Sequence, residues 1–198
     1  YNFYDVEYIP EEGLHEAVGS NGFFGAIWDK VSCHLHPLNY ALGLADAAIK
    51  AGAIIYEHSR VSSYSGSPVV VSTASGQVTA SELILACNGY IEKLEPKINE
   101  YIMPINNFVL ATEPLSEDMA HSIIPKDTSM ADSRFVINYW KLSGCNRLIF
   151  GGGENYRRNF PTDIKGFVGK YMRQIYPQLT DTKIDYGWGG TLAITMNR

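Results

Sequence analysis

The chain has 198 residues, of which 45% are hydrophobic and 19% charged, and its formal net charge is −5. This composition is typical of one or two folded domains and excludes disordered and collagen-like chains. The 16 Lys and Arg residues are scattered, so no clustered basic face for nucleic acid is predicted. No run of about 18 apolar residues occurs, so we expect no membrane-spanning helix. The three cysteines have no CxxC spacing, which suits a reducing compartment and predicts a cytoplasmic protein.

Neither end of the chain resembles a natural terminus. The first residues, Tyr1 to Val6, lack an initiator Met and the basic and apolar regions of a signal peptide. The last residues, Asp185 to Arg198, read as an extended segment and stop without a polar tail. We therefore expect an interior fragment of a longer protein.

The first half of the chain predicts an α/β unit. A short apolar strand over 23–28 precedes a polar loop over 29–34. Apolar residues at helical spacing then predict a helix that begins at Pro37 and ends before Gly52. Apolar runs over 53–56 and 82–87 predict buried strands of a doubly wound sheet.

A hairpin and a second, β-rich lobe complete the predicted elements. Runs over 69–73 and 77–79 flank Ala74-Ser75-Gly76 and predict a β-hairpin. A break at Leu94-Glu95-Pro96 predicts a lobe boundary near residues 90–100. Beyond it, β-prone runs cover 105–111, 135–142 and 147–150, and a second helix is predicted over 161–174.

The strand over 82–87 is followed by small residues and an Asn-Gly pair. Ligands of open α/β sheets bind beyond the carboxyl ends of the strands, where small residues let a bulky cofactor approach the backbone. On spacing alone a tight turn is the better explanation of the same residues, because Asn-Gly is a common turn signal. Elsewhere, His34 and His36 lack a third ligand nearby in sequence, so we expect no metal site.

Ordered segments along most of the chain resemble the D-amino-acid-oxidase and glycine-oxidase superfamily of FAD enzymes. They include Gly25-Ala26-Ile27-Trp28, His34-Leu35-His36-Pro37-Leu38-Asn39, Gly52-Ala53-Ile54-Ile55-Tyr56-Glu57 and Leu83-Ile84-Leu85-Ala86-Cys87-Asn88-Gly89-Tyr90. The second half resembles the gamma-glutamylputrescine oxidase branch in Ala111-Thr112-Glu113-Pro114-Leu115, Arg147-Leu148-Ile149-Phe150-Gly151-Gly152-Gly153, Tyr176-Pro177-Gln178-Leu179 and Lys183-Ile184-Asp185-Tyr186-Gly187-Trp188.

This resemblance implies a mixed α/β (α+β) fold with three segments. Residues 1–33 are expected to end a first part of the substrate domain, 34–95 to form part of a Rossmann-like FAD-binding domain, and 96–198 to form the mixed β-sheet substrate domain. In relatives, the positions that match Val61 and Ala86, Cys87, Asn88 and Gly89 lie near the cofactor. The glycine-rich strand-turn-helix that holds the FAD pyrophosphate is not in this sequence, so we expect the chain alone to bind little or no FAD.

The implied reaction is oxidative deamination of a primary amine, in which flavin takes a hydride and oxygen becomes hydrogen peroxide. Aromatic candidates for the substrate cavity are Tyr139, Trp140, Tyr156 and Trp188, with Tyr139 and Trp188 preferred as catalytic-site residues; packing between a sheet and its helices is the alternative for each. Lys141 stands where relatives often have Arg, which puts a carboxylate contact in doubt. Arg157 and Arg158 could bind a substrate carboxylate as a bidentate fork, but a role as solvent-exposed loop residues explains them more simply.

The expected partners are a small amine of the gamma-glutamylputrescine type and molecular oxygen, with no nucleic acid and no membrane; the oligomeric state is not predicted. Two alternatives remain open. One is an oxidase of glycine, sarcosine or a D-amino acid, and the other is a non-catalytic scaffold.

Overall fold

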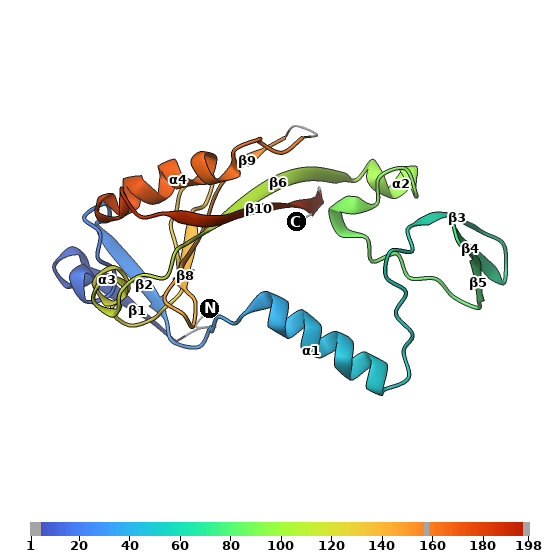
Figure 1. Cartoon of the computed structure of the whole chain (residues 1–198), viewed down its shortest axis with the longest axis horizontal. Helices are drawn as coiled ribbons and strands as arrows, with labels where there is room; N and C mark the ends of the chain where they lie inside the picture. The colour runs from blue at the N-terminus through green and yellow to red at the C-terminus, as the bar shows by residue number, and fades with distance from the viewer. Residues whose placement is uncertain (1–4, 157–158, 196–198) are drawn as a thin grey trace. The chain divides into compact units, whose positions relative to one another are not determined.

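The computed structural model describes residues 5–156 and 159–195 (Figure 1). The chain divides into two compact units. Unit 1 comprises Tyr1–Leu35 and Asn106–Gly190, and unit 2 comprises His36–Ile105 and Thr191–Arg198. The three-segment domain assignment made from the sequence stays a prediction. None of the described helices is both long enough and apolar enough to cross a membrane.

The elements of unit 1 include short 3-10 helices, labelled η. They are β1 (Val6–Pro10), η1 (Glu11–Glu16), β2 (Gly25–Asp29), α3 (Glu117–Ile123), β7 (Met130–Ala131), β8 (Tyr139–Leu142), β9 (Leu148–Asn155), α4 (Ile164–Ile175) and η3 (Pro177–Leu179), with most of β6 (Ile102–Thr112) and β10 (Ile184–Thr195). The elements of unit 2 are α1 (Pro37–Lys50), β3 (Val61–Ser65), β4 (Val69–Thr73), β5 (Gln77–Ala80), η2 (Asn88–Tyr90) and α2 (Pro96–Asn99).

The main sheet of unit 1 has the strand order β10-β6-β9-β8-β7. Strands β6 and β8 both pair antiparallel with β9, and the register places Gly151 between Val109 and Tyr139. Because side chains alternate along a strand, the sheet has two distinct faces. The core face carries Phe108, Leu110, Trp140 and Phe150, all buried. The outer face carries Asn107, Val109, Tyr139, Lys141 and Ile149, all at least partly exposed.

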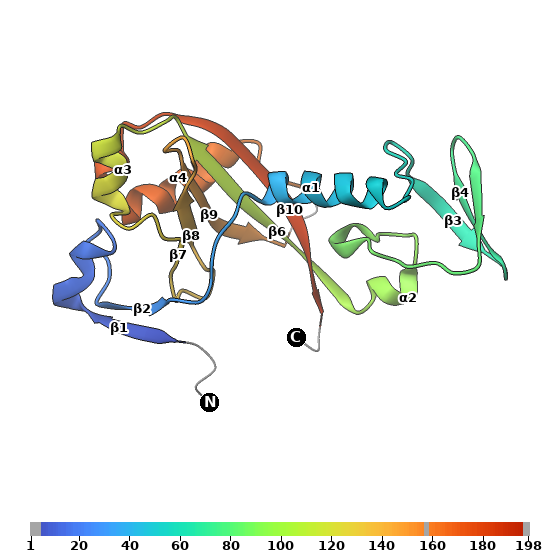
Figure 2. The same ribbon diagram turned by 90° about the horizontal axis from the view of Figure 1, so that it is seen from below.

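Helix α4 packs against β9 and covers part of the core face (Figure 2). The side chain of Asp163 caps the helix by accepting a hydrogen bond from the Gly166 N–H at 2.8 Å. Val168, Met172 and Ile175 are buried in the core cluster, and full burial of such a side chain stabilises a fold by about 1.5–3 kcal/mol. The predicted helix over 161–174 is therefore confirmed, with its start shifted to Ile164.

A buried relay of hydrogen bonds crosses the core of unit 1. The Trp140 indole Nε1 donates to the Tyr176 hydroxyl at 2.8 Å, and that hydroxyl donates to the Ile123 carbonyl at 3.1 Å. The Trp140 ring also stacks on Phe150 and Phe23, with centroids 5.6 Å and 5.9 Å apart. Burial raises the pKa of Tyr176, so the phenol stays protonated and can serve both partners.

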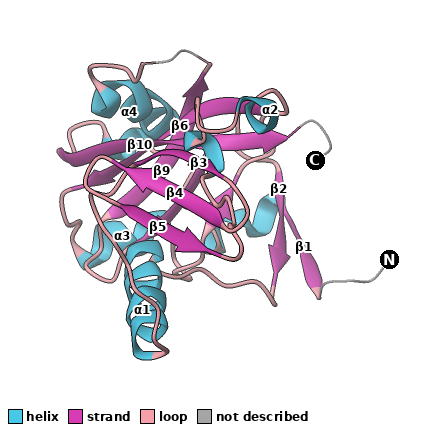
Figure 3. Ribbon diagram, turned by 90° about the vertical axis from the view of Figure 1, so that its right-hand side faces the viewer, coloured by secondary structure: helices cyan, strands magenta, loops and turns pink. Residues whose placement is uncertain are grey.

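The predicted helix and the predicted hairpin of unit 2 are confirmed. The helix begins at Pro37, His36 Nδ1 accepts a hydrogen bond from the Asn39 N–H at 3.3 Å, and Gly52 has a φ of 98° just after the helix. The predicted hairpin is formed by β4 and β5, and β3 pairs with the other edge of β4 (Figure 3).

Two predicted strands of unit 2 are wrong in this structure. Residues 53–56 and 82–87 form no strand, and Ile54 and Ile84 are 75% and 86% exposed. A β-strand exists only when a neighbouring strand satisfies its backbone groups, and no described strand pairs with either of these two runs. The expected mixed α/β fold is confirmed, but the described residues contain no parallel sheet built on these runs.

The predicted strand over 135–142 is also shorter than expected. Pairing begins only at Tyr139, because the Asp132 carboxylate accepts hydrogen bonds from the N–H groups of Arg134 and Asn138, at 3.3 Å and 2.9 Å. These bonds hold residues 132–138 as a loop. Two other predicted runs agree better with the structure: β6 contains the run 105–111, and β9 begins at Leu148, one residue after the start of the predicted run 147–150.

Candidate functional site

On the outer face of the unit 1 sheet, the ring of a tyrosine packs against a glycine of the neighbouring strand. Tyr139 in β8 lies directly opposite Gly151 in β9. A Cβ added to Gly151 would lie 2.1 Å from Cζ of Tyr139 and 2.5 Å from its hydroxyl oxygen, so the ring rests against the glycine backbone. The Tyr139 hydroxyl donates a hydrogen bond to Oδ1 of Asn107 in β6. Three neighbouring strands therefore hold this phenol in one position.

The protonation state of Tyr139 follows from its partial burial. Burial against the sheet raises the pKa of the phenol, although 37% of the residue remains exposed. At neutral pH the side chain is therefore an uncharged hydroxyl. It can orient a ligand through hydrogen bonds, but it is a poor general base.

The rest of the outer face combines apolar and polar groups. Val109 and Ile149 supply partly exposed apolar surface. The Lys141 ammonium donates a hydrogen bond to the Leu35 carbonyl. This arrangement can hold a small ligand against an apolar surface and orient one polar group at Tyr139.

The other aromatic candidates lie elsewhere. Trp140 is only 3% exposed and belongs to the core face, so the packing explanation applies to it. Trp188 is 45% exposed on β10, which β6 and β9 separate from β8 in the sheet order. Tyr156 follows β9, is exposed, and its hydroxyl donates to Glu154 Oε1 at 2.7 Å. The structure thus brings none of these three beside Tyr139 on the outer face of β8. Arg157 and Arg158 lie outside the described residues.

In unit 2, the segment Ala86 to Gly89, which the sequence analysis placed near a cofactor, is hydrogen-bonded to the last residues of β10. Asn88 has a φ of 50°, and its Oδ1 accepts hydrogen bonds from the N–H groups of Gly89 and Ala193 at 2.8 Å and 2.9 Å. The Tyr90 hydroxyl accepts one from the Thr191 N–H at 2.9 Å. A Cβ on Gly89 would lie 2.7 Å from the Thr191 carbonyl oxygen. Close backbone packing therefore explains both the positive φ of Asn88 and the glycine.

The remaining residues of this segment have small or partly exposed side chains, beside which a cofactor could contact the main chain. Ala86 is exposed and carries only a methyl group, and Cys87 is partly exposed. Val61, at the start of β3, is also partly exposed. Asn88 fits less well, because its side-chain oxygen is already used within unit 2. Backbone groups near Val61, Ala86 and Cys87 are therefore the groups of this unit that could hold a cofactor.

The histidine pair has structural partners. His34 Nε2 lies 3.1 Å from the Asp127 carbonyl, and His36 caps α1. No cluster of three or more His, Cys, Asp or Glu side chains suited to a metal ion occurs within residues 5–156 and 159–195.

A cavity of about 940 Å³ lies in unit 1, and Tyr139 is not among the residues that line it. Its walls come from β1, β2 and residues 127–133, with Trp140 among them. The carboxylate of Asp29 accepts hydrogen bonds from the Val31 and Ser32 N–H groups at 2.9 Å and 3.1 Å. The carboxylate of Asp132 accepts the backbone hydrogen bonds that hold the loop over residues 132–138. Two of the acidic side chains that line this cavity, Asp29 and Asp132, thus have structural roles, and we assign the cavity no chemistry.

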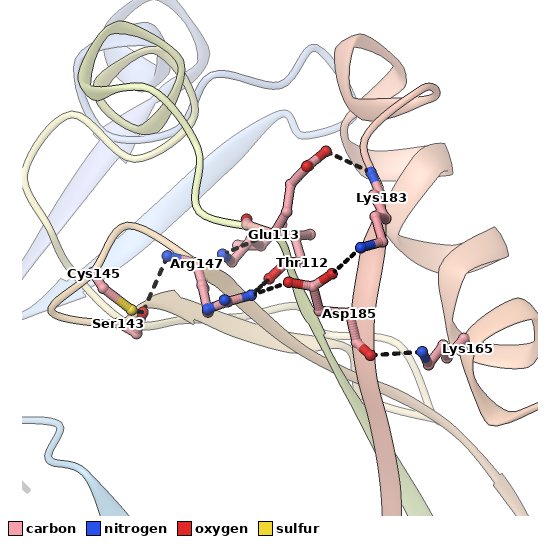
Figure 4. A network of polar contacts seen from close by, with 9 residues as sticks. Thr112, Glu113, Ser143, Cys145, Arg147, Lys165, Lys183 and Asp185 are labelled. Carbon is pink, nitrogen blue, oxygen red and sulfur yellow. Dashed lines mark hydrogen bonds and ion pairs between the residues drawn. The ribbon is translucent and has the colours of Figure 1, made fainter.

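A network of charged groups joins the ends of β6, β9 and β10 (Figure 4). Arg147 Nη1 donates to Asp185 Oδ2 and to the Thr112 carbonyl, both at 2.6 Å, and Lys183 Nζ lies 3.0 Å from Asp185 Oδ1. Hydrogen bonds from Arg147 and then Lys183 hold the pKa of the Asp185 carboxyl below its usual value. Lys165 of α4 donates to the Asp185 carbonyl at 2.6 Å. This network stabilises strand ends and lies apart from the Tyr139 position.

Sequence reasoning missed Asn107. Its signal was a polar Asn106-Asn107 pair inside the apolar run 105–111, where a half-buried strand should alternate. That signal marks an unusual position but does not name a partner, because the contact with Tyr139 depends on the pairing of both residues through β9.

Comparison with known protein families finds one that matches the whole chain. The family described as "DAO: FAD dependent oxidoreductase" matches residues 1–198. A gamma-glutamylputrescine oxidoreductase of Escherichia coli (strain K12) is 39% identical over 195 residues, which is 98% of this chain and 46% of that protein. The chain spans about half the length of the curated relatives it matches.

Solved structures share the fold at low sequence identity. Glycine oxidase from Geobacillus kaustophilus aligns with a TM-score of 0.78 and 18% identity, covering 98% of this chain and 53% of that one. L-proline dehydrogenase from P. horikoshii aligns with a TM-score of 0.77 and 19% identity, covering 98% and 54%.

Proposed function

The chain belongs to the DAO family of FAD-dependent oxidoreductases, and we propose that the longer protein containing it oxidises a primary amine of the gamma-glutamylputrescine type. The observation that carries this proposal is the 39% identity to the Escherichia coli gamma-glutamylputrescine oxidoreductase along 98% of the chain. The outer face around Tyr139 is compatible with it, because it offers a neutral hydroxyl beside apolar surface rather than a cluster of cations.

FAD, when bound, would supply the electron sink, taking a hydride from the carbon that bears the amine and passing two electrons to oxygen to give hydrogen peroxide. The residues of this chain would then bind and orient. Tyr139 would fix the amine end of the substrate by a hydrogen bond, and Val109 and Ile149 would exclude water from the carbon chain. Trp188 stays a second candidate for the wall of the substrate site.

For the cofactor we propose Val61, Ala86, Cys87, Asn88 and Gly89 as neighbours. Val61, Ala86 and Cys87 would contribute backbone groups, and Asn88 and Gly89 would hold the segment in place through their contacts with Ala193 and Thr191. We further propose a cytoplasmic protein, with molecular oxygen as the electron acceptor.

The test uses the full-length protein. After FAD is added and the excess removed, the visible spectrum is recorded, and hydrogen peroxide is then measured with gamma-glutamylputrescine, putrescine, glycine, sarcosine and D-alanine. We expect bound flavin and fastest turnover with gamma-glutamylputrescine. Fastest turnover with an amino acid would favour an amino-acid oxidase, and absence of flavin would favour a scaffold.

A further inference from the structure

The hydrogen bond between Tyr139 and Asn107 fixes more than the position of the ring. A tyrosine hydroxyl has one proton to donate and lone pairs that accept. The proton of Tyr139 is given to Oδ1 of Asn107, and an amide oxygen can only accept. Any further partner of this hydroxyl must therefore be a donor.

The ring cannot easily turn away from this arrangement. It lies against Gly151, and the atoms at the ring's outer end, Cε2, Cζ and the hydroxyl, all face the position where a Cβ would be. Asn107 is only partly exposed and belongs to β6, which pairs with β9 on the side opposite β8. Donor and acceptor thus come from two strands whose spacing is set by the strand between them.

We infer that Asn107 is a positioning residue that makes Tyr139 an acceptor for a substrate N–H group, so that the outer face selects amines over carboxylates at this point. This inference rests on the proposed function and deepens it. A carboxylate has only acceptor oxygens, so it could bind the hydroxyl only after the bond to Asn107 is broken. An amine can donate without any rearrangement.

The other charged group on this face acts at a different place. Lys141 is two residues along β8 from Tyr139, which corresponds to about 7 Å. Its ammonium is directed to the Leu35 carbonyl, and its remaining donors can attract an anion there. Selection at the Tyr139 hydroxyl is therefore tested with ligands that are too small to span both positions.

The experiment measures equilibrium binding to the full-length flavoprotein from changes in the flavin absorption spectrum. The two probes are tert-butylamine, which has no hydrogen on its amine-bearing carbon and so cannot be oxidised, and acetate. The proteins are the wild type, Tyr139→Phe, Asn107→Leu and Asn107→Asp. The matched control is Asn21→Leu, an exposed asparagine in the loop before β2.

Tyr139→Phe should weaken tert-butylamine binding about tenfold, as expected for the loss of one hydrogen bond to a charged or strongly polar partner, and leave acetate within about twofold. Asn107→Leu frees the hydroxyl proton, so the amine should bind about 3–10-fold more weakly and acetate more tightly. Asn107→Asp keeps an acceptor and should retain amine binding. The control should match the wild type for both probes.

An unchanged ratio of amine to acetate affinity in both Tyr139→Phe and Asn107→Leu would overturn the inference, as would a wild type that prefers acetate. Failure of the proposed function is a separate result, namely a wild-type flavin that no amine reduces. If Asn107→Leu does not fold, Tyr139→Phe and Asn107→Asp decide together: an unchanged affinity ratio in Tyr139→Phe, or loss of amine binding in Asn107→Asp, would overturn the inference.

Discussion

Replacing Gly151 with alanine should displace Tyr139 and slow amine oxidation. The new Cβ would lie 2.1 Å from Cζ of Tyr139, whereas ordinary contact begins at 3.4 Å, so the ring must retreat by about 1.3 Å or swing away from the sheet. That movement would break the hydrogen bond to Asn107. Misplacement of a bound substrate by about 1 Å, when a residue that positions it moves, can cost on the order of 100-fold in rate. We therefore expect flavin reduction by the amine to slow by about 10–100-fold.

The assay is anaerobic rapid mixing of the full-length protein with saturating amine, followed through loss of flavin absorbance. Gly144→Ala is the matched control, because nothing lies within 4 Å of the added Cβ. A Gly151→Ala protein that binds FAD normally and reduces it at the wild-type rate would show that Tyr139 does not orient the substrate.

Three further outcomes follow from the packing and the charges. Tyr176→Phe leaves the buried Trp140 indole N–H unpaired, whereas the Ile123 carbonyl keeps its bond from the Gly19 N–H at 3.0 Å. The free energy of unfolding in urea should fall by about 1–3 kcal/mol, and exposed Tyr186→Phe should change it little. The pKa of the Asp185 carboxyl is lowered in the folded state, so its ionised form stabilises the fold above the ordinary carboxyl pKa of about 3.9. This stabilisation is lost as the pH falls through the lower, folded-state pKa. Asp185→Asn should therefore reduce the loss of stability in acid, measured as the urea midpoint at a series of pH values. Gly43→Ala meets no atom within 4 Å inside α1, so it should raise the helix stability of the isolated chain by about 0.5–1 kcal/mol, measured by thermal unfolding at the helix CD signal.

Features with local causes were predictable from the sequence. Helix α1 has a capping residue at His36, Pro37 at its start and Gly52 after its end, and all of these signals lie within the segment itself. Helix α4 and the β4–β5 hairpin were predictable for the same reason.

Features that depend on distant partners were not predictable. The apolar runs over 53–56 and 82–87 have the composition of buried strands, but strand formation needs a neighbour that no described segment provides. In Tyr139-Trp140-Lys141-Leu142 the alternation alone does not say which aromatic residue faces the core. The structure assigns Trp140 to the core and Tyr139 to the outer face.

The candidate site shows the same division. Tyr139 was predicted as an aromatic residue of the substrate cavity. Asn107 was not, because its contact with Tyr139 depends on the register of β6 and β8 with β9. That register includes an irregularity between Asn107 and Val109, which strand patterns in a sequence do not reveal.

The most direct test of amine oxidation is anaerobic mixing of the FAD-loaded, full-length protein with gamma-glutamylputrescine. We predict that the visible flavin band disappears and returns when oxygen is admitted, with one hydrogen peroxide formed for each flavin reoxidised. A flavin band that persists with this substrate and with every other primary amine would contradict the proposed activity.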